Sequence, residues 1–132
     1  MSNQVIYTDA APQPAPVLSQ GVRRGPWVQV SGQGPVDPAT GDFVELGDVA
    51  GQTRAVLENI RTILEAGGAS VGDLFMVRVY LTARDDFEEM NRAYGEFFAA
   101  YGVTDFPART TVFTGLPHEP MLVEIDGLAL ID

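Results

Sequence analysis

Residues 74–82 read LFMVRVYLT, and this run decides the fold. β-Branched and aromatic residues dominate it, as is typical of a strand. Successive side chains of a strand point to opposite faces, and here both faces are largely apolar. A strand of this kind belongs to a sheet that is covered on both sides. We therefore expect helices against one face and a second cover against the other.

An amphipathic helix is expected before this strand, over residues 48–66. Asp48 can cap its first turn, and the pair Gly67-Gly68 gives a typical stop. Its apolar residues recur every three or four positions, which predicts one buried face. These residues are Val49, Val56, Leu57, Ile60, Ile63 and Leu64.

A second helix is expected after the strand. Asp85 or Asp86 can cap it, and Glu88 or Glu89 can complete a capping box. Gly102 can end it. An apolar stripe at helical spacing is expected to pack in the core rather than stack on a cofactor. The stripe consists of Phe87, Met90, Tyr94, Phe97, Phe98 and Tyr101.

The remaining strands are expected near the two ends of the chain. Residues 22–30 predict a hairpin or two short strands, and residues 109–115 and 121–131 predict one strand each. The proline-rich start, residues 1–16, is expected to be an extended lead-in, because proline fixes φ and cannot donate to a sheet ladder. The order β-β-α-β-α-β-β predicts one α+β domain over residues 1–132, with both helices on one face of the sheet. Self-association is the simplest cover for the other face.

The composition excludes several classes of protein and of site. Of 132 residues, 45% are apolar, which is typical of globular proteins, and there is no run of the ~18–20 apolar residues that a membrane span needs. The absence of cysteine excludes disulfides, thiol nucleophiles and zinc–thiolate sites. His118 is the only histidine and cannot form a multi-histidine metal site. We expect no metal, no signal peptide and a cytoplasmic location.

The charge balance argues against a polyanionic partner. Eight arginines face eighteen carboxylates, there is no lysine, and the formal net charge is −10. Nucleic-acid binding depends on basic residues that displace counterions from phosphates, so we expect no nucleic-acid partner. Without lysine, no side chain can form a Schiff base.

Two charged residues near the end of the sequence are the candidates for chemistry. By strand parity, Arg109 and Thr111 share one face of their strand, and Glu124 lies on the polar face of the last strand. We expect Arg109 and Glu124 on neighbouring strands beside a cleft, where arginine can bind a carboxylate and glutamate can move a proton or orient water. The competing interpretation makes Glu124 a solvated strand residue and Arg109 part of a surface salt bridge.

Seven groups of residues then identify a family. They are VSGQ at 30–33, Pro35 with DPATG at 37–41, QTR at 52–54 with LENI at 57–60, EAGGAS at 65–70, DF at 86–87 with MN at 90–91, FPART at 106–110 and VEI at 123–125. In this order they resemble the RidA/YjgF family, over residues 15–130. The resemblance implies the chorismate-mutase-like fold, in which one mixed β-sheet carries two α-helices on one face. It also implies a homotrimer with active-site clefts at the subunit interfaces.

The activity that the resemblance implies is the hydrolysis of reactive 2-imino or enamine acids to 2-keto acids and ammonia, without a cofactor. Arg109 would hold the substrate carboxylate, and Glu124 would position and activate water. Thr111 stands where many members have cysteine. Gly32 would let the backbone approach the ligand closely, and Asn91 would brace the cleft wall.

One departure from the family pattern bears on the substrate. Leu18 stands where many members have tyrosine, so a hydroxyl that would contact the imine nitrogen or the water is missing. This favours, as an alternative, a deaminase or another C–N hydrolase or lyase that acts on a larger carboxylate. A third interpretation is a non-enzymatic trimer that binds a ligand or holds unfolded chains.

Overall fold

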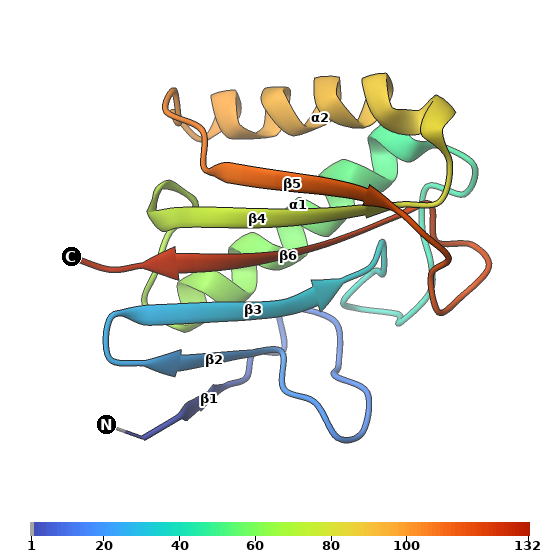
Figure 1. Cartoon of the computed structure of the whole chain (residues 1–132). Coiled ribbons are helices and arrows are strands. Elements are labelled where there is room, and N and C mark those ends of the chain that lie inside the picture. Colours follow the sequence, from blue (N-terminus) through green and yellow to red (C-terminus); the bar gives the residue numbers. More distant parts are fainter. Residues whose placement is uncertain (1) are drawn as a thin grey trace.

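The computed structural model describes residues 2–132, so position 1 of the expected lead-in lies outside the described residues. A six-stranded sheet has the order β1-β2-β3-β6-β4-β5 (Figure 1). Neighbouring strands are antiparallel except β4 and β5, which are parallel, so the sheet is mixed. The elements are β1 Gln4–Ile6, β2 Gly21–Arg24, β3 Trp27–Gln33, α1 Val49–Ala66, β4 Leu74–Leu81, α2 Phe87–Ala100, β5 Ala108–Phe113 and β6 Val123–Leu130.

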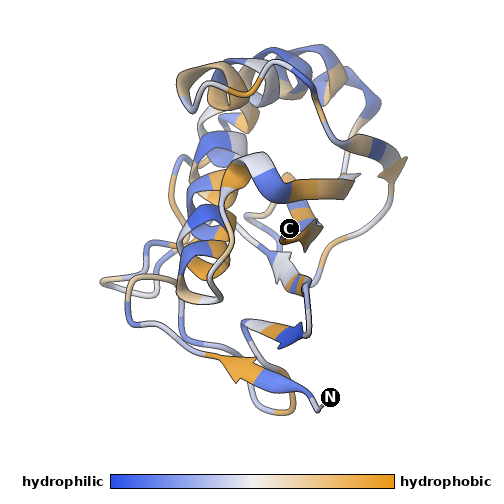
Figure 2. Cartoon of the chain, turned by 90° about the vertical axis from the view of Figure 1, so that its left-hand side faces the viewer, coloured by the Kyte–Doolittle hydropathy of each residue, from blue (hydrophilic) through white to orange (hydrophobic). Residues whose placement is uncertain are grey.

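The helices and the strands form two layers, with the core between them (Figure 2). The prediction of a strand over 74–82 is confirmed, and β4 lies between β6 and β5. Its side chains Val77, Val79 and Leu81 are at most 1% exposed and face the helices. Both helices cover the same face, as the sequence predicts.

Helix α1 begins and ends where its sequence indicates. Asp48 adopts an extended backbone, and its Oδ1 accepts a hydrogen bond from the Gly51 N–H at 3.1 Å. At the other end the N–H of Gly67 donates to the Ile63 carbonyl, and Gly68 has a φ of +88°. A left-handed residue of this kind suits glycine and ends the helix. The six predicted apolar positions are all buried.

The capping box predicted for the second helix is wrong. A 3₁₀ turn, Arg84–Asp86, leads directly into α2. The Asp86 backbone is already helical, with φ −87° and ψ −3°, and its side chain makes no capping hydrogen bond. An N-cap residue needs an extended backbone to aim its oxygen at the first turn, and the 3₁₀ turn removes it. The predicted stripe is buried at Met90, Tyr94, Phe97 and Phe98, whereas Tyr101 is 43% exposed.

The N-terminal lead-in contains a strand that the sequence analysis did not anticipate. β1 pairs with β2 at the edge of the sheet. The segment after it is held by the buried side chain of Gln20, which accepts a hydrogen bond from the Thr8 N–H at 2.8 Å and donates to the Pro12 carbonyl at 2.9 Å. The proline-rich stretch is thereby fixed beside β3.

The second face of the sheet carries both apolar and charged side chains. Trp27 and Val112 are 47% and 41% exposed. Between them, Arg78 donates to the Asp126 carboxylate at 2.9 Å, and the Tyr80 hydroxyl donates to the same group at 3.2 Å. Self-association through this face therefore stays a prediction. No helix in the described part of the chain is long and apolar enough to cross a membrane.

Candidate active site

Arg109 and Glu124 lie on opposite faces of the sheet, and the expectation that they lie on neighbouring strands is wrong. β5 and β6 are not neighbours, because β4 lies between them. Arg109 pairs with the buried Val77 and therefore lies on the helical side. Glu124 pairs with Tyr80 on the other side. Each residue has its own cavity in the chain.

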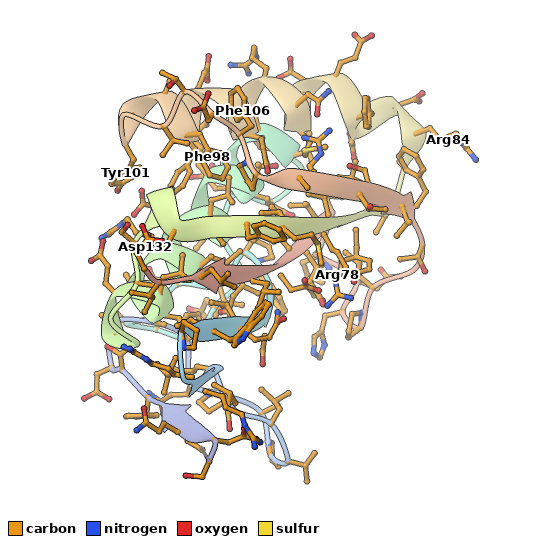
Figure 3. All side chains as sticks on the ribbon, turned by 60° about the vertical axis from the view of Figure 1, so that its left-hand side comes forward. Arg78, Arg84, Phe98, Tyr101, Phe106 and Asp132 are labelled. Carbon is orange, nitrogen blue, oxygen red and sulfur yellow. The ribbon has the colours of Figure 1, made fainter. Side chains whose placement is uncertain are left out.

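The first cavity, the arginine cleft, lies between α2 and the start of β5. It measures about 440 Å³. The guanidinium carbon of Arg109 lies 4.8 Å from the centre of the Tyr94 ring and 5.9 Å from that of Phe87. Phe98 of α2 and Phe106 pack together beside it, with ring centres 5.9 Å apart (Figure 3). The cleft is lined by Asn91, Tyr94, Gly95, Phe106, Pro107 and Arg109.

Arg109 has no carboxylate partner among residues 2–132, although the chain is strongly acidic. Ion pairs in the same range engage Arg61, Arg78 and Arg92 instead. Cation–π contact with an aromatic ring positions a guanidinium without using its N–H donors. The interpretation of Arg109 as part of a surface salt bridge is therefore not supported, and its fork is available for an anion.

Two polar atoms of α2 at this cleft are buried without a hydrogen-bond partner in the described chain. They are Asn91 Oδ1 and the Tyr94 hydroxyl. Burial raises the pKa of Tyr94 to about 12, against a smaller opposing effect of the Arg109 charge. The phenol therefore remains a protonated donor at neutral pH. Among residues 2–132, the lining of this cleft thus combines a cation without a carboxylate partner and two polar atoms that are buried without a hydrogen-bond partner.

The second cavity, the glutamate cavity, lies on the other face of the sheet and measures about 420 Å³. Its walls come from the N-terminal segment, from β3 and from the loop before β6. Gln52 of α1 holds that loop: its amide donates to the Pro120 carbonyl at 2.9 Å and accepts from the Leu122 N–H at 2.8 Å. Apolar walls predominate, and they include Pro12, Leu18, Phe43, Pro117 and Met121.

Glu124 is a partly buried carboxyl at the edge of this cavity. Burial raises its pKa above the ordinary value, and the nearby Asp126 charge adds to the shift. The pairing of β3 with β6 is interrupted by a bulge between Val30 and Gln33. Bulges re-aim side chains and often lie next to active sites. Here the bulge places Gly32 directly against the Glu124 carboxylate.

Replacing Gly32 by alanine is expected to displace the Glu124 carboxylate. A Cβ at this position would collide with Glu124 Oε2. The colliding atom is at the end of a flexible side chain, so the fold should persist. The value of kcat/KM should fall about tenfold or more, because even a small displacement of a reacting group slows a reaction strongly. Gly115→Ala is the matched control, because a Cβ there meets no atom within 4 Å. Equal activity of both variants would contradict this role of Gly32.

The predicted site residues therefore separate into two groups. Arg109 and Asn91 line the arginine cleft. Glu124, Gly32 and Leu18 line the glutamate cavity. One predicted residue, the partly exposed Thr111, follows Arg109 on the helical face but lines neither cavity.

Sequence reasoning missed the contribution of Tyr94, because helical spacing predicts burial but not where a hydroxyl points. It also missed Phe43 and Met121 as walls of the glutamate cavity. Phe43 lies outside every predicted element, and Met121 was expected to begin the last strand, whereas β6 begins at Val123. Over residues 2–132, no group of three or more histidine, aspartate or glutamate side chains could hold a metal ion.

Comparison with known proteins gives matches over nearly the whole chain. A family model described as Endoribonuclease L-PSP matches residues 8–131. A RutC family protein from Pyrococcus horikoshii is 42% identical over 126 residues, which are 96% of each chain. The 2-iminobutanoate/2-iminopropanoate deaminase of Salmonella typhimurium is 38% identical over 128 residues, 97% of this chain and 98% of that protein. Among solved structures, that of E. coli TdcF with bound serine superposes with a TM-score of 0.91. Its sequence is 37% identical, and the match covers 98% of this chain and 99% of the TdcF chain.

The mixed six-stranded sheet with two helices on one face is the chorismate-mutase-like fold of these proteins. The sequence relatives extend over the same range as the motifs at 30–33, 106–110 and 123–125. The chain belongs to the RidA/YjgF family, whose model carries the description Endoribonuclease L-PSP.

Proposed function

We propose that the protein hydrolyses reactive 2-imino or enamine acids to 2-keto acids and ammonia. The observation that carries this proposal is the guanidinium of Arg109, which has a cleft of its own and no carboxylate partner within residues 2–132 of an acidic chain. Such a group suits a small monoanion, because a planar fork binds a carboxylate bidentately. The relative from Salmonella typhimurium is named for two imino acids of this class, 2-iminobutanoate and 2-iminopropanoate. E. coli TdcF was crystallised with bound serine, which also carries a carboxylate.

A complete site would need two subunits. Within one chain the sheet separates Arg109 from Glu124. A small imino acid cannot contact both residues of one chain, so a neighbouring subunit has to supply one of them. Assembly around the second face of the sheet would also cover the exposed Trp27 and Val112. A homotrimer with sites at its subunit interfaces meets both needs, because a closed ring repeats one heterologous contact.

The chemistry assigned to Glu124 is proton transfer to and from water. Water adds to the carbon of the C=N bond, and its proton passes to the carboxylate as the C–O bond forms. The carboxyl passes this proton to the nitrogen, which gives a carbinolamine. As the C–N bond breaks, the hydroxyl gives up its proton and becomes the keto oxygen, and the nitrogen takes up this second proton through the carboxylate and leaves as ammonia. A carboxyl whose pKa is raised by burial is a better base than a solvated one. Gly32 gives the ligand backbone access beside it.

A larger substrate is the second candidate, and the walls of the glutamate cavity favour it. Leu18, Phe43 and Met121 face this cavity. Apolar walls of this size suit a bulky hydrocarbon or aromatic side chain better than a methyl group. The same two charged residues would act on such a substrate, so this candidate changes the side chain and not the reaction. A non-enzymatic holdase would have no use for an arginine in a cleft of its own or for a partly buried carboxyl at the edge of a second cavity.

RNA cleavage, which the description of the family model suggests, is a poorer match for this chain. The net charge is −10, and Arg61, Arg78 and Arg92 are occupied by carboxylates. Phosphate backbones are bound through clusters of free basic residues. We therefore do not propose a nucleic-acid substrate.

The test is the release of keto acid and ammonia from imines that an amino-acid oxidase generates in situ. The parent should accelerate hydrolysis over the spontaneous rate, with side chains from methyl to aromatic compared in parallel. Arg109→Ala should lose about 100-fold or more in kcat/KM, since two charge-assisted hydrogen bonds disappear. Arg84→Ala is the control, because Arg84 lies over the Phe113 ring outside the cleft. No acceleration with any side chain would refute the proposed function.

A further inference from the structure

The core stripe of α2 contains a hydroxyl that the described chain leaves unsatisfied. Tyr94 is 4% exposed, and its phenolic oxygen has no hydrogen-bond partner within residues 2–132. Buried polar groups in folded proteins are almost always paired, and an exception calls for a reason. A phenylalanine would fill the same space without this cost. The hydroxyl is therefore a candidate for contact with a ligand.

The ring of Tyr94 is fixed by the aromatic core around it. Phe98 packs against it with ring centres 4.8 Å apart, and Phe106 stacks on it at 6.5 Å. The guanidinium of Arg109 lies over the same ring, 4.8 Å from its centre. Because the ring is held by the core, it in turn sets the position of the arginine. Both side chains line the arginine cleft.

The unused donors in this cleft point to one kind of ligand group. The guanidinium has no carboxylate partner among residues 2–132, and the phenol has no acceptor there. A carboxylate has two oxygens with about four lone-pair sites, so it can accept from both at once. The phenol keeps its proton at neutral pH, because burial raises its pKa to about 12.

We propose that Tyr94 is a ligand-binding residue, whose hydroxyl donates a hydrogen bond to the carboxylate that Arg109 holds, while its ring positions the guanidinium. The inference deepens the proposed function, on which it rests for the choice of a 2-keto or 2-imino acid as the ligand. It also explains why a buried donor is retained without a partner within residues 2–132. Binding sites commonly trade stability for function in this way.

The inference predicts that Tyr94→Phe changes stability and affinity in opposite directions. Removing an unsatisfied buried hydroxyl should raise Tm by about 2–5 °C. The dissociation constant of 2-oxobutanoate, measured by titration calorimetry, should rise about tenfold, as expected for a lost hydrogen bond to a charged group. The constant for the uncharged 2-oxobutanamide should stay the same. A purely structural tyrosine would not distinguish the two probes.

Tyr101→Phe is the matched control. Tyr101 also belongs to the α2 stripe, but it is 43% exposed and its hydroxyl donates to Glu58 at 2.8 Å, outside the cleft. This variant should bind both probes as the parent does and should not gain stability. An unchanged affinity of Tyr94→Phe for 2-oxobutanoate would overturn the inference. A lowered Tm would overturn it as well, because the hydroxyl would then be satisfied in the unliganded protein.

Turnover is measured separately so that the two proposals can fail separately. If the parent binds 2-oxobutanoate in a Tyr94-dependent way but hydrolyses no imine, the proposed function is wrong and the assignment of Tyr94 stands. If the parent hydrolyses imines and Tyr94→Phe binds the probe as the parent does, the assignment alone is wrong. A parent that hydrolyses imines but does not bind 2-oxobutanoate at millimolar concentration also refutes the assignment.

Discussion

Replacing Glu124 by glutamine is expected to lower kcat/KM about 10²–10⁴-fold, the usual contribution of a positioned general acid or base. The amide keeps the size and the polarity of the side chain but can neither take nor deliver the proton of the attacking water. Initial rates of keto-acid release at several imine concentrations measure the loss. Glu119→Gln is the matched control. Glu119 is an exposed glutamate in the loop that leads into β6, and it does not line the glutamate cavity.

The same substitution should leave the protein more stable at neutral pH. The pKa of Glu124 is raised in the folded chain, because burial and the Asp126 charge disfavour the ionised form. Folding therefore favours the protonated Glu124 carboxyl. The stability that this carboxyl contributes to the parent at low pH is lost as the pH rises through the raised pKa. Glutamine carries no charge at any pH. The difference in Tm between variant and parent should therefore be positive at pH 7 and shrink toward pH 4.

The activity of the parent should follow the same titration. If Glu124 acts as a base, kcat/KM falls as the pH drops, with a midpoint above 4.5, the ordinary pKa of glutamate. A glutamine variant with full activity, or a rate that is flat over this range, would contradict the assigned role. A variant that loses activity together with stability would indicate a structural role instead.

The elements of the fold could be predicted because their signals are local. The run of β-branched and aromatic residues at 74–82, the capping residue Asp48 and the pair Gly67-Gly68 each act within a few residues. The strand, the cap and the stop are found in the structure as expected. The start of α2 was mispredicted, although its signal is also local. Asp86 carries the side chain of an N-cap, but the 3₁₀ turn before it gives its backbone the wrong conformation.

The site could be predicted as a set of residues but not as an arrangement. Strand parity correctly gives the face that Arg109 shares with Thr111, since both pair with buried residues of β4. Parity relates side chains within one strand and does not say which strands are neighbours. The last strand of the chain, β6, inserts between β3 and β4, and this non-local pairing separates Arg109 from Glu124. The place of Tyr94 in the wall of the arginine cleft was missed for another reason, because helical spacing predicts that a side chain is buried and not that it lines a cavity.

Because the sheet separates Arg109 from Glu124, we expect two inactive variants to restore each other's activity when their chains assemble together. Arg109→Ala and Glu124→Gln chains, each inactive alone, should recover activity when they are unfolded, mixed in equal amounts and refolded together. In a randomly assembled ring of three, three quarters of the trimers are mixed, and each mixed trimer has one site with both native residues. The expected recovery is about a quarter of the parental activity.

Two controls make this result specific to a site shared between subunits. A chain that carries both substitutions should restore nothing when it is refolded with either single variant, because no interface then combines a native Arg109 with a native Glu124. Parent chain that is unfolded and refolded in the same way corrects for losses during refolding, and each single variant refolded alone gives the background. If the mixture stays inactive although size-exclusion chromatography shows trimers, both residues must serve the same site from one chain. The strand order argues against that outcome, because β4 and the thickness of the sheet lie between the two side chains.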